Sequence, residues 1–240
     1  MKACALTDTG RVRTANQDYV YASVEPVGSL PNLFVVADGM GGHQAGDYAS
    51  RYIVENLVSY LQYTENSQIV PLLREAILKV NTMLYHEAKE KPEFSGMGTT
   101  LVLAVVVGEN MHIVNIGDSR IYMAEKKAVK QLTRDHTLVQ NLLDRGQISQ
   151  QEALNHPKKH YITRAIGVGD TLDIDYQMYE LKKESIVLLC TDGLSNYLEI
   201  EKLPELLKNC IRKESLADLI DFANDQGGSD NITAVMLYRK

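Results

Sequence analysis

Short apolar runs along the chain predict a set of β-strands. The first run is rich in β-branched residues, and a turn containing glycine and asparagine at 108–110 separates two of the later runs. The predicted strands are 33–37, 99–107, 111–116, 121–123, 186–190 and 232–238.

Three further segments carry apolar residues at every third or fourth position, which is the spacing of a helix with one buried face: 49–61, 73–84 and 216–223. Two of these helices are adjacent near the start of the chain, and consecutive strands dominate its middle. That order favours an α+β fold over alternating β-α-β units. The polar stretch 136–167 predicts short helices and loop along one edge. Because no linker or repeat divides the chain, we expect a single domain over residues 1–240.

Composition restricts the class of protein. A net charge of −6 argues against sequence-independent binding to nucleic acid, which needs a basic face. Three widely spaced cysteines indicate reduced thiols rather than a zinc or redox site. The chain starts without the apolar stretch of a signal peptide, and its longest apolar run, 101–107, is too short to span a membrane. We therefore expect a cytoplasmic protein that binds neither nucleic acid nor membrane.

Aspartate recurs where predicted strands begin or end, usually beside glycine. Asp38, Asp118 and Asp192 follow predicted strands, and Asp230 precedes one. Each alone is explained by a turn, because aspartate and glycine both tolerate positive φ. Strand ends of packed sheets lie near one another, however, so the four together predict converging carboxylates whose repulsion cations would neutralise.

The absence of a cysteine or histidine cluster in the sequence favours hard cations, Mg²⁺ or Mn²⁺, over softer metals. Two such ions about 3.5–4 Å apart, bridged by a carboxylate, would lower the pKa of a bridging water and orient it for in-line attack on phosphorus. A calcium loop is disfavoured, since Asp170, Asp173 and Asp175 lack the glycine and terminal glutamate of such loops. We interpret that trio as a solvated loop.

Such a site also needs groups that hold phosphate and protonate a leaving group. Arg13, five residues before Asp18, can bind phosphate with two parallel hydrogen bonds, although an isolated arginine is more often a surface charge. Glycine permits close backbone approach, so the carbonyl of Gly39 is a candidate metal ligand. His43 is a candidate general acid, because the ordinary histidine pKa is near 6.5, but a lone histidine is also common at surfaces.

Taken in order, these motifs resemble the type 2C metal-dependent serine/threonine protein phosphatases (the PPM family) in their compact bacterial form. The resemblance runs from about residue 5 to residue 238, and it is the complete series rather than any one motif that carries it. The motifs are 10–13 with 16–18, 37–43, 96–100, 115–120, 135–136, 162–167, 191–194 and 229–233.

The resemblance implies a four-layer α-β-β-α sandwich, in which helix pairs flank two antiparallel sheets and metals bind in a cleft at one end. It implies hydrolysis of phosphoserine and phosphothreonine by a water or hydroxide that bridges two Mn²⁺ or Mg²⁺ ions. Residues of about 136–165 would form a flap beside the cleft that influences substrate choice. Phosphorylated proteins would be the partners of a monomeric enzyme that opposes a bacterial serine/threonine kinase.

The resemblance also implies a role for each site residue. Asp38 would bridge the two ions, with the Gly39 carbonyl as a further ligand. Asp192 and Asp230 would hold the first ion, and Asp118 would join Asp192 at a third. Asp18 would serve the second ion, and Arg13 would hold the substrate phosphate.

One position departs from the family pattern. Gln17 stands where a glutamate usually precedes the aspartate of the first motif, and a neutral amide cannot replace that charge near the second ion. Two alternative functions stay open. The first rests on Gln17 alone and is a catalytically inactive module that binds phosphoproteins. The second rests on the basic cluster 158–160 and is a phosphatase for small phosphorylated molecules, unless that cluster is a solvated loop.

Overall fold

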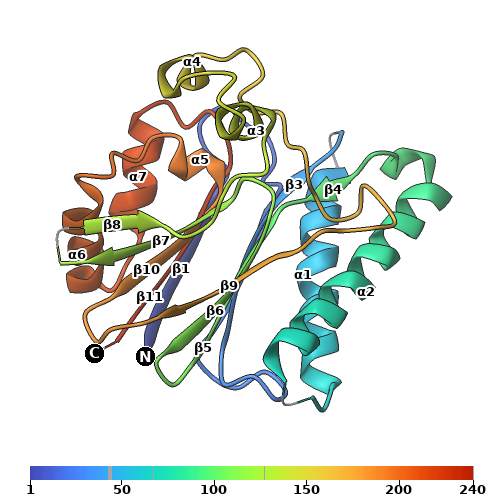
Figure 1. Cartoon of the computed structure of the whole chain (residues 1–240), viewed down its shortest axis with the longest axis horizontal. Coiled ribbons are helices and arrows are strands. Elements are labelled where there is room, and N and C mark those ends of the chain that lie inside the picture. The colour runs from blue at the N-terminus through green and yellow to red at the C-terminus, as the bar shows by residue number, and fades with distance from the viewer. Residues whose placement is uncertain (43–44, 67, 127, 240) are drawn as a thin grey trace.

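Two antiparallel β-sheets lie face to face at the centre of the molecule, and helices cover both outer faces (Figure 1). The computed structural model describes residues 1–42, 45–66, 68–126 and 128–239. The predicted α+β architecture, a four-layer α-β-β-α sandwich, is confirmed.

Both sheets are built from strands that are far apart in sequence. In the first sheet the order is β1 (Lys2–Asp8), β11 (Ile232–Tyr238), β10 (Ile186–Cys190), β7 (Arg120–Glu125) and β8 (Ala128–Gln131). In the second it is β2 (Asp18–Ser23), β3 (Leu33–Met40), β5 (Leu101–Val107), β6 (Asn110–Ile116) and β9 (Asp175–Glu180), with β4 (Gly98–Thr99) paired to β3. The first and last strands of the chain, β1 and β11, are neighbours.

Helices pack on the outer face of each sheet through a one-sided apolar stripe. The long helices α1 (Ala45–Tyr63) and α2 (Ile69–Glu90) cover the second sheet. Helices α6 (Leu203–Lys213) and α7 (Ala217–Asp225), with the short α5 (Asp192–Ser195), cover the first. A third apolar cluster fills the space between the sheets.

Strand alternation decides which side chains enter the layer between the sheets. Along β3, Leu33, Val35 and Ala37 pack under the helices, whereas Phe34 and Val36 belong to the cluster between the sheets. Asp38, the next even-numbered position of β3, is therefore directed into the same layer, at the end of that layer.

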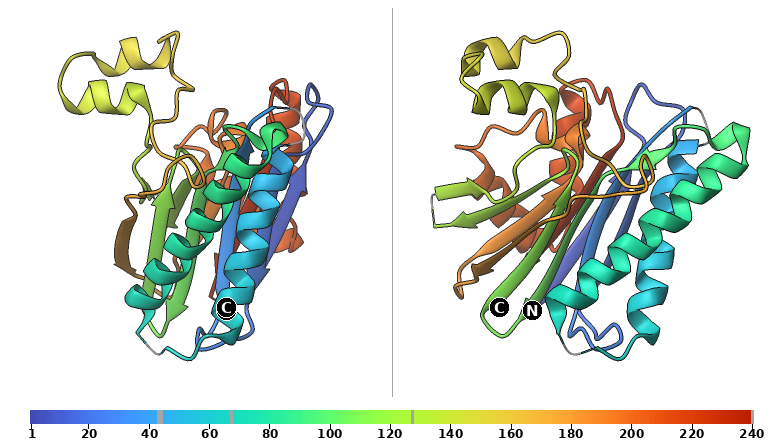
Figure 2. Two further views of the ribbon diagram at one scale, coloured as in Figure 1. Left: turned by 90° about the vertical axis from the view of Figure 1, so that its right-hand side faces the viewer. Right: turned by 45° about the vertical axis from the view of Figure 1, so that its right-hand side comes forward.

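The flap segment stands at one end of the sandwich, away from the chain termini (Figures 1 and 2). It contains α3 (Leu138–Asp144) and α4 (Gln150–Leu154), in agreement with the predicted short helices. Thr137 caps α3 by accepting from the Gln140 N–H, and Ser149 opens α4 with a capping box.

Two expectations about individual residues are wrong. Asp38 and Gly39 do not follow the strand but lie within β3, because pairing with β2 and β4 continues to Met40. Asp175 is not in a solvated loop, since it opens β9 and forms an ion pair with Arg164 (Nη1 to Oδ1, 2.6 Å).

Candidate metal centre

Polar side chains replace apolar ones at one end of the layer between the sheets. Asp18 and Asp38 are direct cross-strand partners on β2 and β3, so their side chains share one face of the sheet. Other strands contribute polar residues two positions beyond an apolar residue of the layer: Thr100, Asn115, Thr191 and Thr233. The alternation that builds the core thus also directs buried polar groups to one place.

Hydrogen bonds fix the two central aspartates. The Asp38 N–H donates to Thr100 Oγ1 at 2.9 Å, and the Thr100 N–H donates back to the Asp38 carbonyl at 2.9 Å. Thr191 Oγ1 donates to Asp18 Oδ2 at 2.9 Å, while Asp18 Oδ1 is buried without a hydrogen-bond partner. These contacts fix the backbone of Asp38 and one carboxylate oxygen of Asp18, and they leave Asp18 Oδ1 for another ligand.

The electrostatic state of this pair is unfavourable without a cation. Burial, opposed in part by hydroxyl hydrogen bonds and reinforced by the carboxylates of Asp192 and Asp230, raises the pKa of Asp18 from 3.8 to about 7. Loss of solvation and then the charge of Asp18 raise the pKa of Asp38 well above its ordinary value. Both groups therefore resist ionisation at neutral pH.

The remaining aspartates reach the same place from loops and a helix start. Asp118 lies in the turn between β6 and β7, Asp192 is the first residue of α5, and Asp230 precedes β11. Burial and then the charge of Asp192 raise the pKa of Asp118 to about 7. Burial and then the charge of Asp230 raise the pKa of Asp192. Aspartates from segments far apart in the chain thus lie close enough to raise one another's pKa.

The carboxylates suit hard divalent cations. Asp18 and Asp118 each have one buried oxygen without a hydrogen-bond partner, and a divalent cation would both satisfy these oxygens and remove the repulsion. In the ranges that the structure describes, no three histidine, cysteine, aspartate or glutamate side chains stand together as a complete ligand group. The residues fit such an ion by the chemistry of their oxygen atoms and by their mutual charge.

Arg13 lies beside these aspartates. One Nη atom is 2.9 Å from Asp230 Oδ2, and about half of the Arg13 side chain is exposed. The guanidinium is therefore anchored at the site while still facing solvent. His43, the candidate general acid, is outside the described residues.

Close backbone packing requires glycine at position 39. A Cβ there would lie 2.0 Å from the carbonyl oxygen of Gly46 in α1, a contact that no side chain can make. The Gly39 N–H donates to the Gln17 carbonyl, and the Gln17 side chain packs against Gly46. Gln17 thus joins the start of α1 to the strand that carries Asp38.

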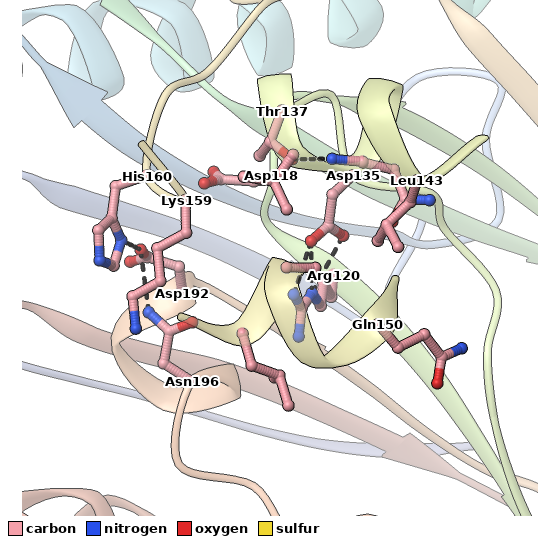
Figure 3. A pocket seen from close by; sticks show the side chains of 14 residues that line it. Asp118, Arg120, Asp135, Thr137, Leu143, Gln150, Lys159, His160, Asp192 and Asn196 are labelled. Atoms are coloured by element: carbon pink, nitrogen blue, oxygen red, sulfur yellow. Dashed lines mark hydrogen bonds and ion pairs between the residues drawn. The ribbon is translucent and has the colours of Figure 1, made fainter. Parts of the chain in front are cut away.

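A cleft of about 400 Å³ separates the aspartates from the flap (Figure 3). Asp118 and Asp192 line one side of it, and Lys159 and His160 line the flap side. His160 Nδ1 is 3.9 Å from Asp192 Oδ2, so the flap reaches over the site. Lys158, by contrast, extends over the ring of Tyr161.

Sequence reasoning missed the contacts that attach the flap to the site. Arg120 forms a bidentate ion pair with Asp135, with its shortest contact at 2.6 Å (Figure 3). His136 accepts from the Gly117 N–H through Nδ1 at 3.0 Å and lies 3.1 Å from Asp175 Oδ2 through Nε2. The adjacent pair 135–136 stood out as a motif, but its partners are distant in sequence.

The chain matches a known family and known proteins over almost its whole length. The family model described as protein phosphatase 2C matches residues 9–235. The chain belongs to the protein phosphatase 2C family. It is 38% identical over 238 residues to the serine/threonine phosphatase stp of Listeria monocytogenes, covering 97% of this chain and 94% of that protein.

Solved structures of the family superpose closely on the whole chain. The serine/threonine phosphatase PstP/Ppp of Mycobacterium tuberculosis gives a TM-score of 0.89 at 34% identity, covering 100% of this chain and 99% of that one. The catalytic domain of PstP in complex with two manganese ions gives 0.85 at 33% identity, covering 98% and 96%. Among the described residues of our chain, no helix is long and apolar enough to cross a membrane.

Proposed function

We propose that this chain is a metal-dependent phosphatase that removes phosphate from phosphoserine and phosphothreonine residues of other proteins. The observation that carries this proposal is the convergence of Asp18, Asp38, Asp118 and Asp192 at one end of the sandwich, where burial and mutual repulsion raise the pKa of each. Buried carboxylates without a compensating charge destabilise a fold, so cation binding explains their presence better than packing does.

Each aspartate has a part in holding Mn²⁺ or Mg²⁺. The charges of the four other carboxylates all act on Asp38, which places it centrally. Asp38 is therefore the group that would bridge two ions, with the Gly39 carbonyl beside it. Asp192 and Asp230 would hold the first ion, and Asp18 the second. Asp118, together with Asp192, would bind a third. Bound there, the ions supply an activated water and neutralise charge on the phosphate.

The remaining protein groups bind and orient the substrate. Arg13 is anchored through Asp230 and half exposed, so its free N–H groups can donate to phosphate oxygens directly beside the aspartates. His43 would protonate the leaving serine or threonine oxygen. The Gln17 backbone supports the strand, because its N–H donates to Asn231 Oδ1 and its carbonyl accepts from the Gly39 N–H.

A protein substrate suits the open cleft better than a small molecule does. The cleft of about 400 Å³ extends from the aspartates under the flap, which gives room for residues beside the phosphorylated one. We propose residues 1–240 as one catalytic domain, with 136–165 as the flap. The enzyme would act as a monomer in the cytoplasm, opposing a serine/threonine kinase. Three free cysteines support a reducing compartment.

Phosphate release from a phosphothreonine peptide in the presence of Mn²⁺ tests the proposal. Asp38→Ala and Asp192→Ala should each lower the rate at least about a hundredfold, since even outer contacts to metal ligands are worth 10–100-fold. Asp173→Ala, at an exposed position, is the control. Turnover that survives in the two site variants or after complete chelation would refute metal-dependent catalysis. Faster hydrolysis of sugar phosphates than of phosphopeptides would favour the small-molecule alternative.

A further inference from the structure

The cleft under the flap is continuous with the candidate metal centre. Asp118 and Asp192 line one part of it (Figure 3), and residues of the flap helices α3 and α4 line another part. A substrate whose phosphate lies at the aspartates can therefore place a neighbouring residue in this cleft.

The flap turns an apolar wall towards the cleft. Val139 and Leu143, one helical turn apart on α3, face it together with Ala153 and Leu154 of α4. Val139 and Ala153 are buried, so the wall is packed from behind, whereas Leu154 is 66% exposed. A leucine this exposed at the mouth of a cleft is available to cover an apolar group of a ligand.

The wall is held at a fixed position relative to the aspartates. Thr137 and Ile162 form a β-bridge that closes the neck of the flap. The His136 N–H donates to the Gly117 carbonyl at 2.9 Å, directly before Asp118, and the Thr163 N–H donates to the His136 carbonyl at 2.8 Å. A pre-organised wall lowers the ordering cost of binding.

Magnitudes decide which chemistry the cleft selects. Lys159 could attract an acidic side chain, but an exposed ion pair contributes little to binding. Burying a leucine or valine side chain against an apolar wall contributes more. Among the charged residues that line the cleft, Arg120 and Asp135 neutralise each other.

We propose that this cleft is a specificity site for an aliphatic side chain within two residues of the phosphorylated residue, bound against Leu143 and Leu154. The inference rests on the proposed function and adds the class of substrate: phosphoprotein segments with leucine, isoleucine or valine beside the phosphothreonine.

Peptides that differ at one position test this inference. A polar phosphothreonine peptide is compared with four versions that carry leucine at the first or second residue on either side. With Mn²⁺, wild-type protein should hydrolyse at least one leucine peptide with a KM about tenfold lower and a similar kcat, which corresponds to about 1.4 kcal/mol. Leu154→Ser should remove most of this preference by raising the KM of the leucine peptide towards that of the polar one.

The controls separate the wall from general effects on the protein. Val24→Ser changes another exposed apolar residue (41% exposed), directly after β2 and away from Asp18, and should leave the preference intact. Leu143→Ser should act in the same direction as Leu154→Ser. Equal KM for all five peptides, a lower KM for the polar peptide than for every leucine peptide, or a leucine preference that persists in Leu154→Ser would overturn the inference but not the proposed function. Failure to hydrolyse any of the peptides would contradict both the inference and the proposed function.

Discussion

Neutralising Asp18 should stabilise the metal-free protein. An asparagine at this position would keep the carbonyl oxygen that accepts from Thr191 Oγ1 and would replace the unpartnered Oδ1 by an N–H₂ donor. The cross-strand partner of this position is Asp38, whose pKa is raised by burial and then by the charge of Asp18. Asp18→Asn thus removes a buried repulsion with little change of shape.

The size and sign of the effect follow from the pKa of Asp18, which is raised from 3.8 to about 7. Above pH 7 the Asp18 carboxyl is ionised in both states, but its ionisation is unfavourable only in the folded state. Each pKa unit corresponds to about 1.4 kcal/mol, so the charge lowers the free energy of unfolding by about 4 kcal/mol at pH 8. As the pH falls through 7 towards 4 the native carboxyl binds its proton first, so the cost shrinks to under about 2 kcal/mol at pH 5.

Urea unfolding after exhaustive chelation measures this difference. We expect Asp18→Asn to raise the free energy of unfolding by roughly 2–4 kcal/mol at pH 8, and by clearly less at pH 5. Asp173→Asn, at an exposed position, should change neither value. Saturating Mn²⁺ should reverse the order of the two proteins, because the wild type binds the ion better. Equal or lower stability of Asp18→Asn at pH 8, or a gain that is the same at pH 5, would refute the reasoning.

Three further predictions concern phosphate binding, packing and pH. Arg13→Ala should lower kcat/KM on a phosphopeptide about 10–100-fold through lost charge-assisted hydrogen bonds, whereas Arg11→Ala should have little effect; steady-state kinetics that show equal losses would contradict this. Gly39→Ala should lower the free energy of unfolding in urea by about 1–3 kcal/mol or more, because its Cβ meets a backbone carbonyl at 2.0 Å, and unchanged stability would contradict this packing. Mn²⁺ affinity measured by calorimetry should rise about tenfold or more from pH 6 to pH 8, since the ion displaces protons from Asp18 and Asp118, whose pKa values are about 7; a pH-independent affinity would count against these carboxylates as ligands.

The sequence predicted the interior strands better than the edges. Continuous apolar runs such as those of β5 and β10 can only be buried, so their positions were found within a few residues. Strands β2 and β9 were missed because they contain tyrosines and charged residues and are only partly buried. Their conformation depends on pairing with β3 and β6, which no local pattern specifies.

The candidate site was predictable where chemistry repeats along the chain. Asp38, Asp118, Asp192 and Asp230, at the limits of apolar runs, indicated a common end of the sheets, and in the fold the charges of the other three do act on Asp38. The attachment of the flap was not predictable, because Arg120 with Asp135 and Arg164 with Asp175 become pairs only through folding. A local pattern reports which residues are polar but not which distant partner they meet.

Anomalous diffraction from a crystal soaked in Mn²⁺ tests the central claim most directly. The account predicts two strong manganese peaks at the end of the layer between the sheets, with Asp38 within coordinating distance of both and Asp192 and Asp230 beside one of them. Manganese bound elsewhere, or no peak next to Asp38 at saturating Mn²⁺, would contradict it.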